Sequence, residues 1–395
     1  MEAFFRTHAY LLEHTNAPVR RLLMDEIDWN DRMIGIKGTR GVGKTTFLLQ
    51  YAKEKFRIND RKCLYVNMNN FYFQERGIAD FAGEFYKNGG EVLLIDQVFK
   101  ETGWSRELRK CYDMYPGLKI VFTGSSVMRL KEENAELRDI VKSYNLRGFS
   151  LREFINLRAG CDLKPYTLDE ILDNHESIIR EILPKASPRE YFNDYLHHGF
   201  YPFFLERRNY SENLLKTMNM MTEVDILLIK QIELKYLTKI KRLFYLLATN
   251  GPKAPNVSQL AKKIETSRAT VMNYIKYLSE ARLINIIYPP GETFPRKPTK
   301  VMLHNSNLAY VISPLTIKMQ DIMETFFVNC LWKDHRVNQI GKERHYIIDG
   351  EKKFRVCNAL GNSNIRRAPN TIYARYNTEI GRGNQVPLWL FGFLY

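Results

Sequence analysis

Residues 38–45 read Gly38-Thr39-Arg40-Gly41-Val42-Gly43-Lys44-Thr45, the complete G-x-x-x-x-G-K-[ST] pattern of a phosphate-binding loop. An apolar run, Met33 to Ile36, precedes the pattern, and a stretch with helical periodicity, Thr45 to Lys55, follows it. Strand, loop and helix thus stand in the order that such a loop requires. A glycine-rich turn before an ordinary helix is the simpler alternative, but the full pattern and its flanks favour a nucleoside triphosphate site.

The residue types in this loop each suit a task in phosphate binding. Gly41 and Gly43 let backbone N–H groups turn toward a phosphate, beside the positive end of the following helix. Lys44 is expected to reach the β- and γ-phosphates, and the Thr45 hydroxyl is expected to ligate Mg²⁺. We therefore expect ATP or ADP, with Mg²⁺, to contact Gly38, Thr39, Arg40, Gly41, Val42, Gly43, Lys44, Thr45 and Thr46.

Three further apolar segments follow at the spacing of βαβ units, at Lys62–Val66, Val92–Ile95 and Leu118–Phe122. They predict an α/β fold with a parallel sheet and flanking helices. The second segment ends in Asp96, where a carboxylate supports the water shell of Mg²⁺. The third leads to Ser125, which either senses the γ-phosphate or caps a helix.

The composition is that of a folded, basic protein. Its 395 residues are 45% hydrophobic and 26% charged, enough for two or three domains. The net charge of +15 suggests a polyanionic partner such as nucleic acid, although acidic proteins and membrane surfaces are alternatives. Five scattered cysteines without C-x-x-C spacing indicate neither a disulfide framework nor a zinc ribbon. No stretch has transmembrane length, so we expect a cytoplasmic protein without a membrane partner.

The pattern along the chain changes three times. We expect a nucleotide-binding domain at residues 1–160 and a helical lid or linker at 161–242. A third domain is expected at 243–315 and a small α+β domain at 316–395. The last ten residues, Val386 to Tyr395, are so apolar that we expect them to be buried.

The third domain resembles a helix-turn-helix. Two short helical segments lie at residues 256–264 and 267–278, and strand-like stretches at 283–288 and 300–303 complete the pattern of a winged helix. If this domain binds DNA, the exposed side chains to test are Arg268, Thr270, Asn273 and Lys276. A lid that contacts other proteins is the alternative.

With these pieces placed, the chain resembles prokaryotic AAA-type ATPases that join an AAA module, a winged helix and a C-terminal PD-(D/E)xK nuclease-like domain. Besides the loop, the resemblance rests on Leu94-Ile95-Asp96, Trp104-Ser105-Arg106-Glu107-Leu108, Phe122-Thr123-Gly124-Ser125-Ser126, Phe149-Ser150-Leu151-Arg152-Glu153-Phe154, Glu324-Thr325-Phe326-Phe327 and Pro387-Leu388-Trp389-Leu390-Phe391-Gly392-Phe393-Leu394-Tyr395. It implies an AAA fold that binds ATP.

The departures from that family fall at its catalytic positions. The family places Glu after the Walker B Asp, whereas this chain has Gln97, whose amide can orient water but is a poor proton acceptor. Of the arginines that neutralise phosphate charge in the family, Arg138 alone remains, in a shifted register. A partner or a neighbouring subunit is an alternative source of that arginine, which leaves homo-oligomerisation open.

The nuclease-like domain departs further. Asp349 is retained, but Arg355 stands at the second carboxylate position and Ala359 at the lysine position, so we expect no nuclease activity. Glu324 could bind an ion with Asp349, or form a surface salt bridge, which is the simpler interpretation.

Three functions remain open from the sequence. The first is an ATP-binding protein with weak or absent hydrolysis, whose winged-helix and nuclease-like domains are nucleotide-controlled binding modules. The second is an active ATPase stimulated by DNA or self-association, with Gln97 positioning the attacking water. The third is a DNA- or protein-binding paralogue that no longer needs nucleotide.

Overall fold

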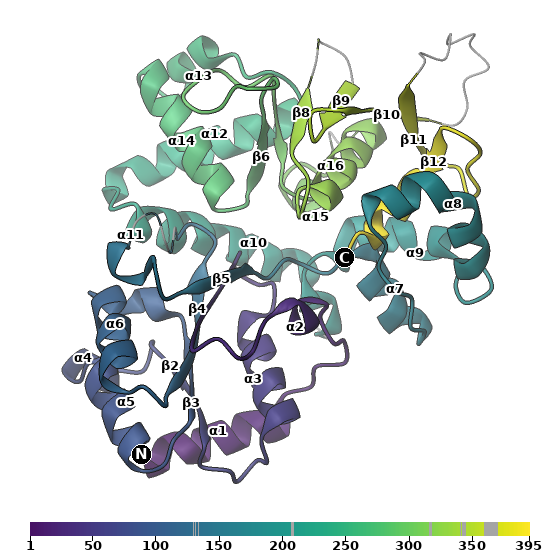
Figure 1. Cartoon of the computed structure of the whole chain (residues 1–395). Coiled ribbons are helices and arrows are strands. Elements are labelled where there is room, and N and C mark those ends of the chain that lie inside the picture. Colours follow the sequence, from purple (N-terminus) through teal and green to yellow (C-terminus); the bar gives the residue numbers. More distant parts are fainter. Residues whose placement is uncertain are drawn as a thin grey trace. The chain divides into compact units, whose positions relative to one another are not determined.

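A computed structural model describes residues 1–128, 130, 132, 134–206, 209–315, 318–339, 341, 345–358 and 370–395. The chain forms two compact units, Met1–Gly148 and Phe149–Tyr395 (Figure 1). The finer division predicted at residues 160, 242 and 315 remains a prediction.

The first unit alternates helices and strands. Its elements are α1 (Glu2–His14), α2 (Leu23–Glu26), β1 (Met33–Gly38), α3 (Lys44–Lys55), β2 (Cys63–Asn67), α4 (Tyr72–Glu75), α5 (Ile78–Lys87), β3 (Val92–Asp96), α6 (Trp104–Met114), β4 (Lys119–Ser125) and β5 (Lys142–Asn145). Each predicted apolar segment overlaps one of these strands, and the predicted helix after the loop is α3.

Within the described residues, these strands form a parallel five-stranded sheet in the order β2-β3-β4-β1-β5. Helices α1 and α3 cover one face, and α5 and α6 cover the other (Figure 1). Burial on both faces explains why β1, β3 and β4 are almost continuously apolar. The predicted α/β fold is confirmed. Because β4 lies between β1 and β3, the phosphate-binding loop and Asp96 end on the same edge, one strand apart.

The second unit begins with helices and ends in a mixed sheet. Its elements are α7 (Leu151–Ala159), α8 (Leu168–Ile182), α9 (Pro188–Asp194), α10 (Tyr210–Met220), α11 (Leu227–Ile229), α12 (Leu237–Asn250), α13 (Val257–Lys263), α14 (Arg268–Glu280), β6 (Ile284–Ile287), β7 (Lys300–Leu303), α15 (Ser306–Ile312), α16 (Met319–Leu331), β8 (Val337–Gln339), β9 (His345–Ile348), β10 (Lys352–Asn358), β11 (Thr371–Tyr376) and β12 (Gln385–Pro387).

Helices α13 and α14 are the predicted pair, and each begins at a side-chain cap. The Asn256 and Ser267 oxygens accept hydrogen bonds from backbone N–H groups in the first turns of α13 and α14, at 3.1 and 3.0 Å. Strands β6 and β7 pair antiparallel, as predicted, with Ile284 opposite Leu303. The element order is that of a winged helix, an interpretation that stays a prediction.

The C-terminal sheet has the order β12-β11-β10-β9-β8 in the described part of the chain. Strands β10, β11 and β12 run parallel, while β8 and β9 join antiparallel, which gives the mixed sheet of an α+β domain. After β12 the chain forms a 3₁₀ helix, Leu388–Phe393, in which every residue is buried. The predicted burial of this ending is confirmed.

The Phe149–Phe154 motif has a structural role in the second unit. Ser150 and Glu153 form a reciprocal capping box at the start of α7. The guanidinium of Arg152, 7% exposed, donates to the backbone oxygens of Tyr395 (3.0 Å) and Leu163 (3.1 Å). The motif thus ties α7 to the C-terminal segment, which explains why a chain that departs from the catalytic pattern can keep it.

Candidate functional site

The phosphate-binding loop adopts the backbone that its glycines permit. Gly41 and Gly43 have φ of 83° and 93°, in the left-handed region that side chains disfavour. Helix α3 starts at Lys44 and carries no acidic residue in its first turn. Its first N–H groups therefore present positive potential to an incoming anion.

The base of the loop is closed by backbone beyond β5. A Cβ on Gly38 would lie 2.4 Å from the backbone oxygen of Leu146, so a side chain there forces the backbone to move. The buried guanidinium of Arg21 donates to the Val42 oxygen (3.3 Å) and to the oxygens of Arg147 (2.7 Å) and Gly148 (3.0 Å). Arg21 was not predicted, because an arginine 17 residues before the loop belongs to no local pattern.

Lys44 and Thr45 lie where the sequence places them. The Lys44 ammonium donates to the backbone oxygens of Gly38 (2.8 Å) and Thr39 (2.9 Å), so it lies folded over the loop. The Thr45 hydroxyl donates to Asp96 Oδ2 at 2.7 Å and joins α3 to the end of β3. The predicted Mg²⁺ pair, Thr45 and Asp96, is therefore in contact. Of the other predicted loop contacts, Thr39 and Val42 are buried, while Arg40 and Thr46 are partly exposed.

Asp96 is the centre of a buried hydrogen-bond network and is itself 1% exposed. Besides Thr45, its donors among the described residues are the hydroxyl groups of Thr123 and Tyr65 (2.9 Å) and the more distant Asn67 amide (3.4 Å). Burial raises the pKa of the Tyr65 phenol, and the Asp96 charge raises it further. Tyr65 and Asn67 were missed because nothing in the sequence of β2 distinguishes them from other strand residues.

On β4, the residue that reaches the network is Thr123. Its hydroxyl contacts Asp96 and also accepts from the Gln97 backbone N–H at 2.9 Å. Ser125 lies opposite Gly38 in the pairing of β4 with β1, and its hydroxyl accepts from the Val127 N–H at 3.4 Å. The Ser125 role at the γ-phosphate stays a prediction.

The two other predicted catalytic residues are not brought to Asp96. Gln97 follows Asp96 with φ of 58°, a left-handed conformation, and its side chain is partly exposed. Arg138 follows a short 3₁₀ helix and has an exposed side chain. Neither side chain is among the described partners of Asp96, and their roles toward nucleotide remain predictions.

Glu324 and Asp349, from the domain predicted to be nuclease-like, are engaged in separate interactions. Glu324 is 2% exposed and accepts from the Lys300 ammonium (2.7 Å) and the Tyr346 hydroxyl (2.6 Å). The simpler interpretation of Glu324, a surface salt bridge, is wrong, because its partner Lys300 lies in β7 and is buried too. Asp349 instead contacts His335 at 2.7 Å. Ala359 lies outside the described residues.

The described part of the chain contains no group of three or more His, Cys, Asp or Glu side chains that could hold a metal ion. Nor does it contain a helix long and apolar enough to cross a membrane.

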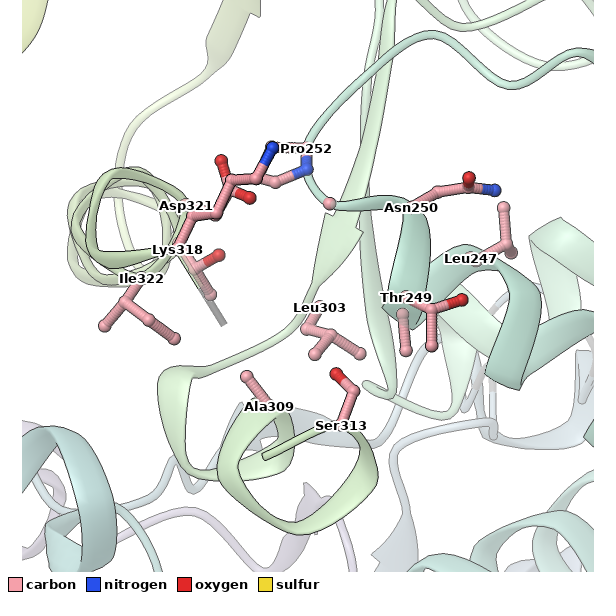
Figure 2. A pocket seen from close by; sticks show the side chains of 13 residues that line it. Leu247, Thr249, Asn250, Pro252, Leu303, Ala309, Ser313, Lys318, Asp321 and Ile322 are labelled. Atoms are coloured by element: carbon pink, nitrogen blue, oxygen red, sulfur yellow. The ribbon is translucent and has the colours of Figure 1, made fainter. Parts of the chain in front are cut away.

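A cavity of about 80 Å³ lies between α12, α15 and α16 (Figure 2). Its apolar wall includes Leu247, Leu303 and Ile322, and Asn250 and Asp321 stand at its polar side. A ligand-sized pocket has about 300 Å³ or more, so this cavity suits a few waters better than a nucleotide.

Comparison with known proteins agrees with the first unit. Residues 30–155 match a family model described as an AAA domain, and residues 189–310 match a domain of unknown function. With its sheet and loop, the first unit is an AAA-type P-loop domain. Neither model describes a winged helix or a nuclease, so those two interpretations stay predictions.

Relatives of known sequence or structure are distant. An uncharacterized protein of Methanocaldococcus jannaschii is 26% identical over 284 residues, which are 68% of this chain but only 59% of the relative. A RuvB variant of Thermotoga maritima is 15% identical with a TM-score of 0.28, covering 76% of this chain and 91% of that one. The ORC1 protein of Aeropyrum pernix, solved with DNA, is 13% identical with a TM-score of 0.29, covering 80% and 92%. These scores are too low to support a statement about function.

Proposed function

We propose that this chain binds ATP with Mg²⁺ at the loop between β1 and α3 and hydrolyses it slowly or not at all. The observation that carries the proposal is the contact between Thr45 and Asp96 (2.7 Å), directly beside the open first turn of α3. The Thr45 hydroxyl and the Asp96 carboxylate would hold a magnesium ion that accompanies the nucleotide. When bound, Mg²⁺ supplies charge neutralisation for the phosphates.

Slow hydrolysis is proposed because no carboxylate follows Asp96. The Gln97 amide can donate to or accept from water, but it does not take a proton at neutral pH. Loss of a general base typically costs about 10²–10⁴ in rate. A nucleotide that stays bound would regulate the second unit as a switch, rather than supply energy through hydrolysis.

An active ATPase, stimulated by DNA or by self-association, is the alternative. In that case Gln97 positions the water, and Arg138 or an arginine of another subunit neutralises the phosphate charge. Turnover that rises with DNA or with protein concentration would favour this alternative over the switch.

The nucleotide site is tested with Lys44→Met. Because the ammonium is expected to exchange two backbone oxygens for phosphate oxygens, we expect this change to weaken ATP binding by about 10- to 100-fold, the value of a charged hydrogen bond. Isothermal titration calorimetry with ATP and Mg²⁺ measures it. Lys55→Met, an exposed change at the opposite end of α3, is the matched control and is expected to leave affinity unchanged.

Two outcomes would contradict the proposal. A parent protein that binds neither ATP nor ADP at millimolar concentration has no nucleotide site. If Lys44→Met and Lys55→Met weaken ATP binding equally, the net charge of the protein, and not the loop, attracts the nucleotide.

A second candidate function is DNA binding by α14, favoured by the arrangement of its polar face. Thr270, Asn273 and Lys276 recur every third residue; Asn273 is exposed, and Thr270 and Lys276 are partly exposed rather than fully exposed as predicted, whereas Val271 and Leu278 are buried. The Lys276 ammonium lies 4.7 Å from the centroid of the Phe294 ring, which belongs to the segment between β6 and β7. This contact orders a cation beside the two strands.

For DNA binding, the informative change is Arg268→Ala, because Arg268 is exposed in the first turn of α14. We expect salt-dependent duplex binding by the parent, and a salt slope lower by about 1 in the variant if the guanidinium contacts a phosphate. Fluorescence anisotropy across a salt series measures both. Lys216→Ala on α10, where Lys216 pairs with Glu212, is the control for net charge.

Comparison with Lys44→Met separates the functions. DNA binding that Lys44→Met alters only in the presence of ATP indicates a nucleotide-controlled module. DNA or protein binding that changes neither with ATP nor with Lys44→Met indicates the paralogue that no longer needs nucleotide. If the parent protein shows no salt-sensitive DNA binding, the α14 surface is ruled out as a DNA-binding site.

A further inference from the structure

Strand β2 brings a phenol to the carboxylate at the end of β3. Tyr65 is 5% exposed, and its hydroxyl donates to Asp96 Oδ2 at 2.9 Å. Asn67, two residues further on the same face, donates its amide to the Tyr65 oxygen at 3.3 Å. Because β2 pairs with β3 in register Asn67↔Asp96, this contact follows from the sheet itself.

We propose that Tyr65 is a positioning residue that orients Asp96 toward a magnesium ion bound with the nucleotide. The inference rests on the proposed nucleotide site and adds to it a residue outside the phosphate-binding loop and the β3 motif.

The hydrogen bonds of Asp96 explain why a further donor is needed to fix the orientation of its carboxylate. A carboxylate is held more firmly in one orientation when both of its oxygens accept hydrogen bonds. Thr123 donates to Oδ1 from β4, whereas Thr45 donates to Oδ2 from α3. The Thr45 hydroxyl is also expected to turn its oxygen to Mg²⁺, which leaves its hydrogen bond to Asp96 less constrained. Tyr65, at 2.9 Å, and the more distant Asn67 amide, at 3.4 Å, are the described donors to Oδ2 that are not themselves expected to ligate the metal.

Tyr65 is itself held firmly. Its backbone N–H donates to the Nδ1 atom of His8 at 3.1 Å, which ties β2 to α1. His8 is 1% exposed, and burial lowers its pKa to about 4, so the ring is neutral and Nδ1 accepts at neutral pH. The backbone that carries the buried phenol is therefore anchored to α1 as well as to β3.

Two effects of the phenol oppose each other at the metal. Its hydrogen bond draws negative charge away from the carboxylate, which weakens attraction to Mg²⁺, but it also fixes the direction of the free lone pairs. Loss of an outer partner of a metal ligand typically weakens metal binding by about 10- to 100-fold, so orientation is the larger effect.

The test compares nucleotide affinity with and without the metal. We expect Tyr65→Phe to weaken ADP binding about tenfold in Mg²⁺ and to leave ADP binding in EDTA within about twofold of the parent. Calorimetry on both proteins gives the ratio of the two affinities. Tyr51→Phe, which removes the hydroxyl of another buried tyrosine, stacked on Trp29 in the same unit, is the matched control and should leave the ratio unchanged.

A general structural role would not produce this pattern. Equal weakening of ADP binding in Mg²⁺ and in EDTA would mean that Tyr65 only supports the fold, and unchanged ADP affinity in both conditions would mean that Asp96 does not depend on Tyr65. Either result overturns the proposal.

A nucleotide-free measurement keeps failure of the proposed function distinguishable. Melting temperatures of Tyr65→Phe, Asp96→Asn and the double variant form a cycle, and we expect the double variant to lose less than the sum of the single losses. Additive losses would show that Tyr65 does not hold Asp96. If the parent binds no nucleotide, the proposed function and the magnesium role fail together, while this cycle still decides the contact.

Discussion

Lys300→Met is expected to lower the free energy of unfolding of the second unit by about 3–5 kcal/mol, because it strands a buried carboxylate. Lys300 and Glu324 are 4% and 2% exposed, and their ion pair measures 2.7 Å. The Tyr346 hydroxyl, 2.6 Å from Glu324, is a single dipole and does not replace a full charge. Methionine fills similar volume, so the loss reports the missing charge rather than a cavity.

Hydrogen exchange of the α16 backbone amides in rising urea measures this change within the second unit. Lys297→Met, an exposed change three residues earlier, controls for the loss of a surface lysine and should stay within about 0.5 kcal/mol. The double change Lys300→Met with Glu324→Leu should recover most of the loss, since a buried pair replaced by apolar groups is often neutral. A Lys300→Met protein as stable as Lys297→Met would show that Glu324 is solvated or protonated.

Gln97→Glu is expected to raise ATP turnover by about 10²–10⁴ with little change in ATP affinity. The Gln97 backbone N–H donates to the Thr123 hydroxyl at 2.9 Å, and Gln97 directly follows Asp96, so the substitution adds a carboxylate next to the residue proposed to support Mg²⁺. A carboxylate both orients water and accepts its proton, whereas the amide only orients it. Single-turnover phosphate release, with calorimetry on the same sample, separates rate from binding.

Gln97→Ala is the matched control because it removes the amide without adding a base. Turnover that appears only in Gln97→Glu establishes a nucleotide-held switch. If the parent already turns over and Gln97→Ala abolishes it, the amide is a working water-positioning group and the chain is an enzyme. If Gln97→Glu binds ATP but does not raise its turnover, the group that hydrolysis lacks is an arginine and not the general base.

Several elements of this protein are predictable because their signal is local in the sequence. The phosphate-binding loop, the apolar strands β1, β3 and β4 and the capped helices α13 and α14 are each encoded within about a dozen neighbouring residues. The apolar ending of the chain is also local, since a run of that hydropathy has to be buried. Strand β5 shows the limit, because Lys142, Ser143 and Asn145 lie on an exposed edge and carry no apolar pattern.

Which side chains meet depends instead on how the strands and helices pack. Tyr65 reaches Asp96 because β2 pairs with β3, and Thr123 reaches it because β4 lies on the other side. Likewise, Lys300 meets Glu324 only because β7 packs beside α16, which turns an apparent surface charge into a buried ion pair. Hydrophobic periodicity and turn chemistry act between near neighbours, whereas strand order and packing bring together residues that no local pattern connects.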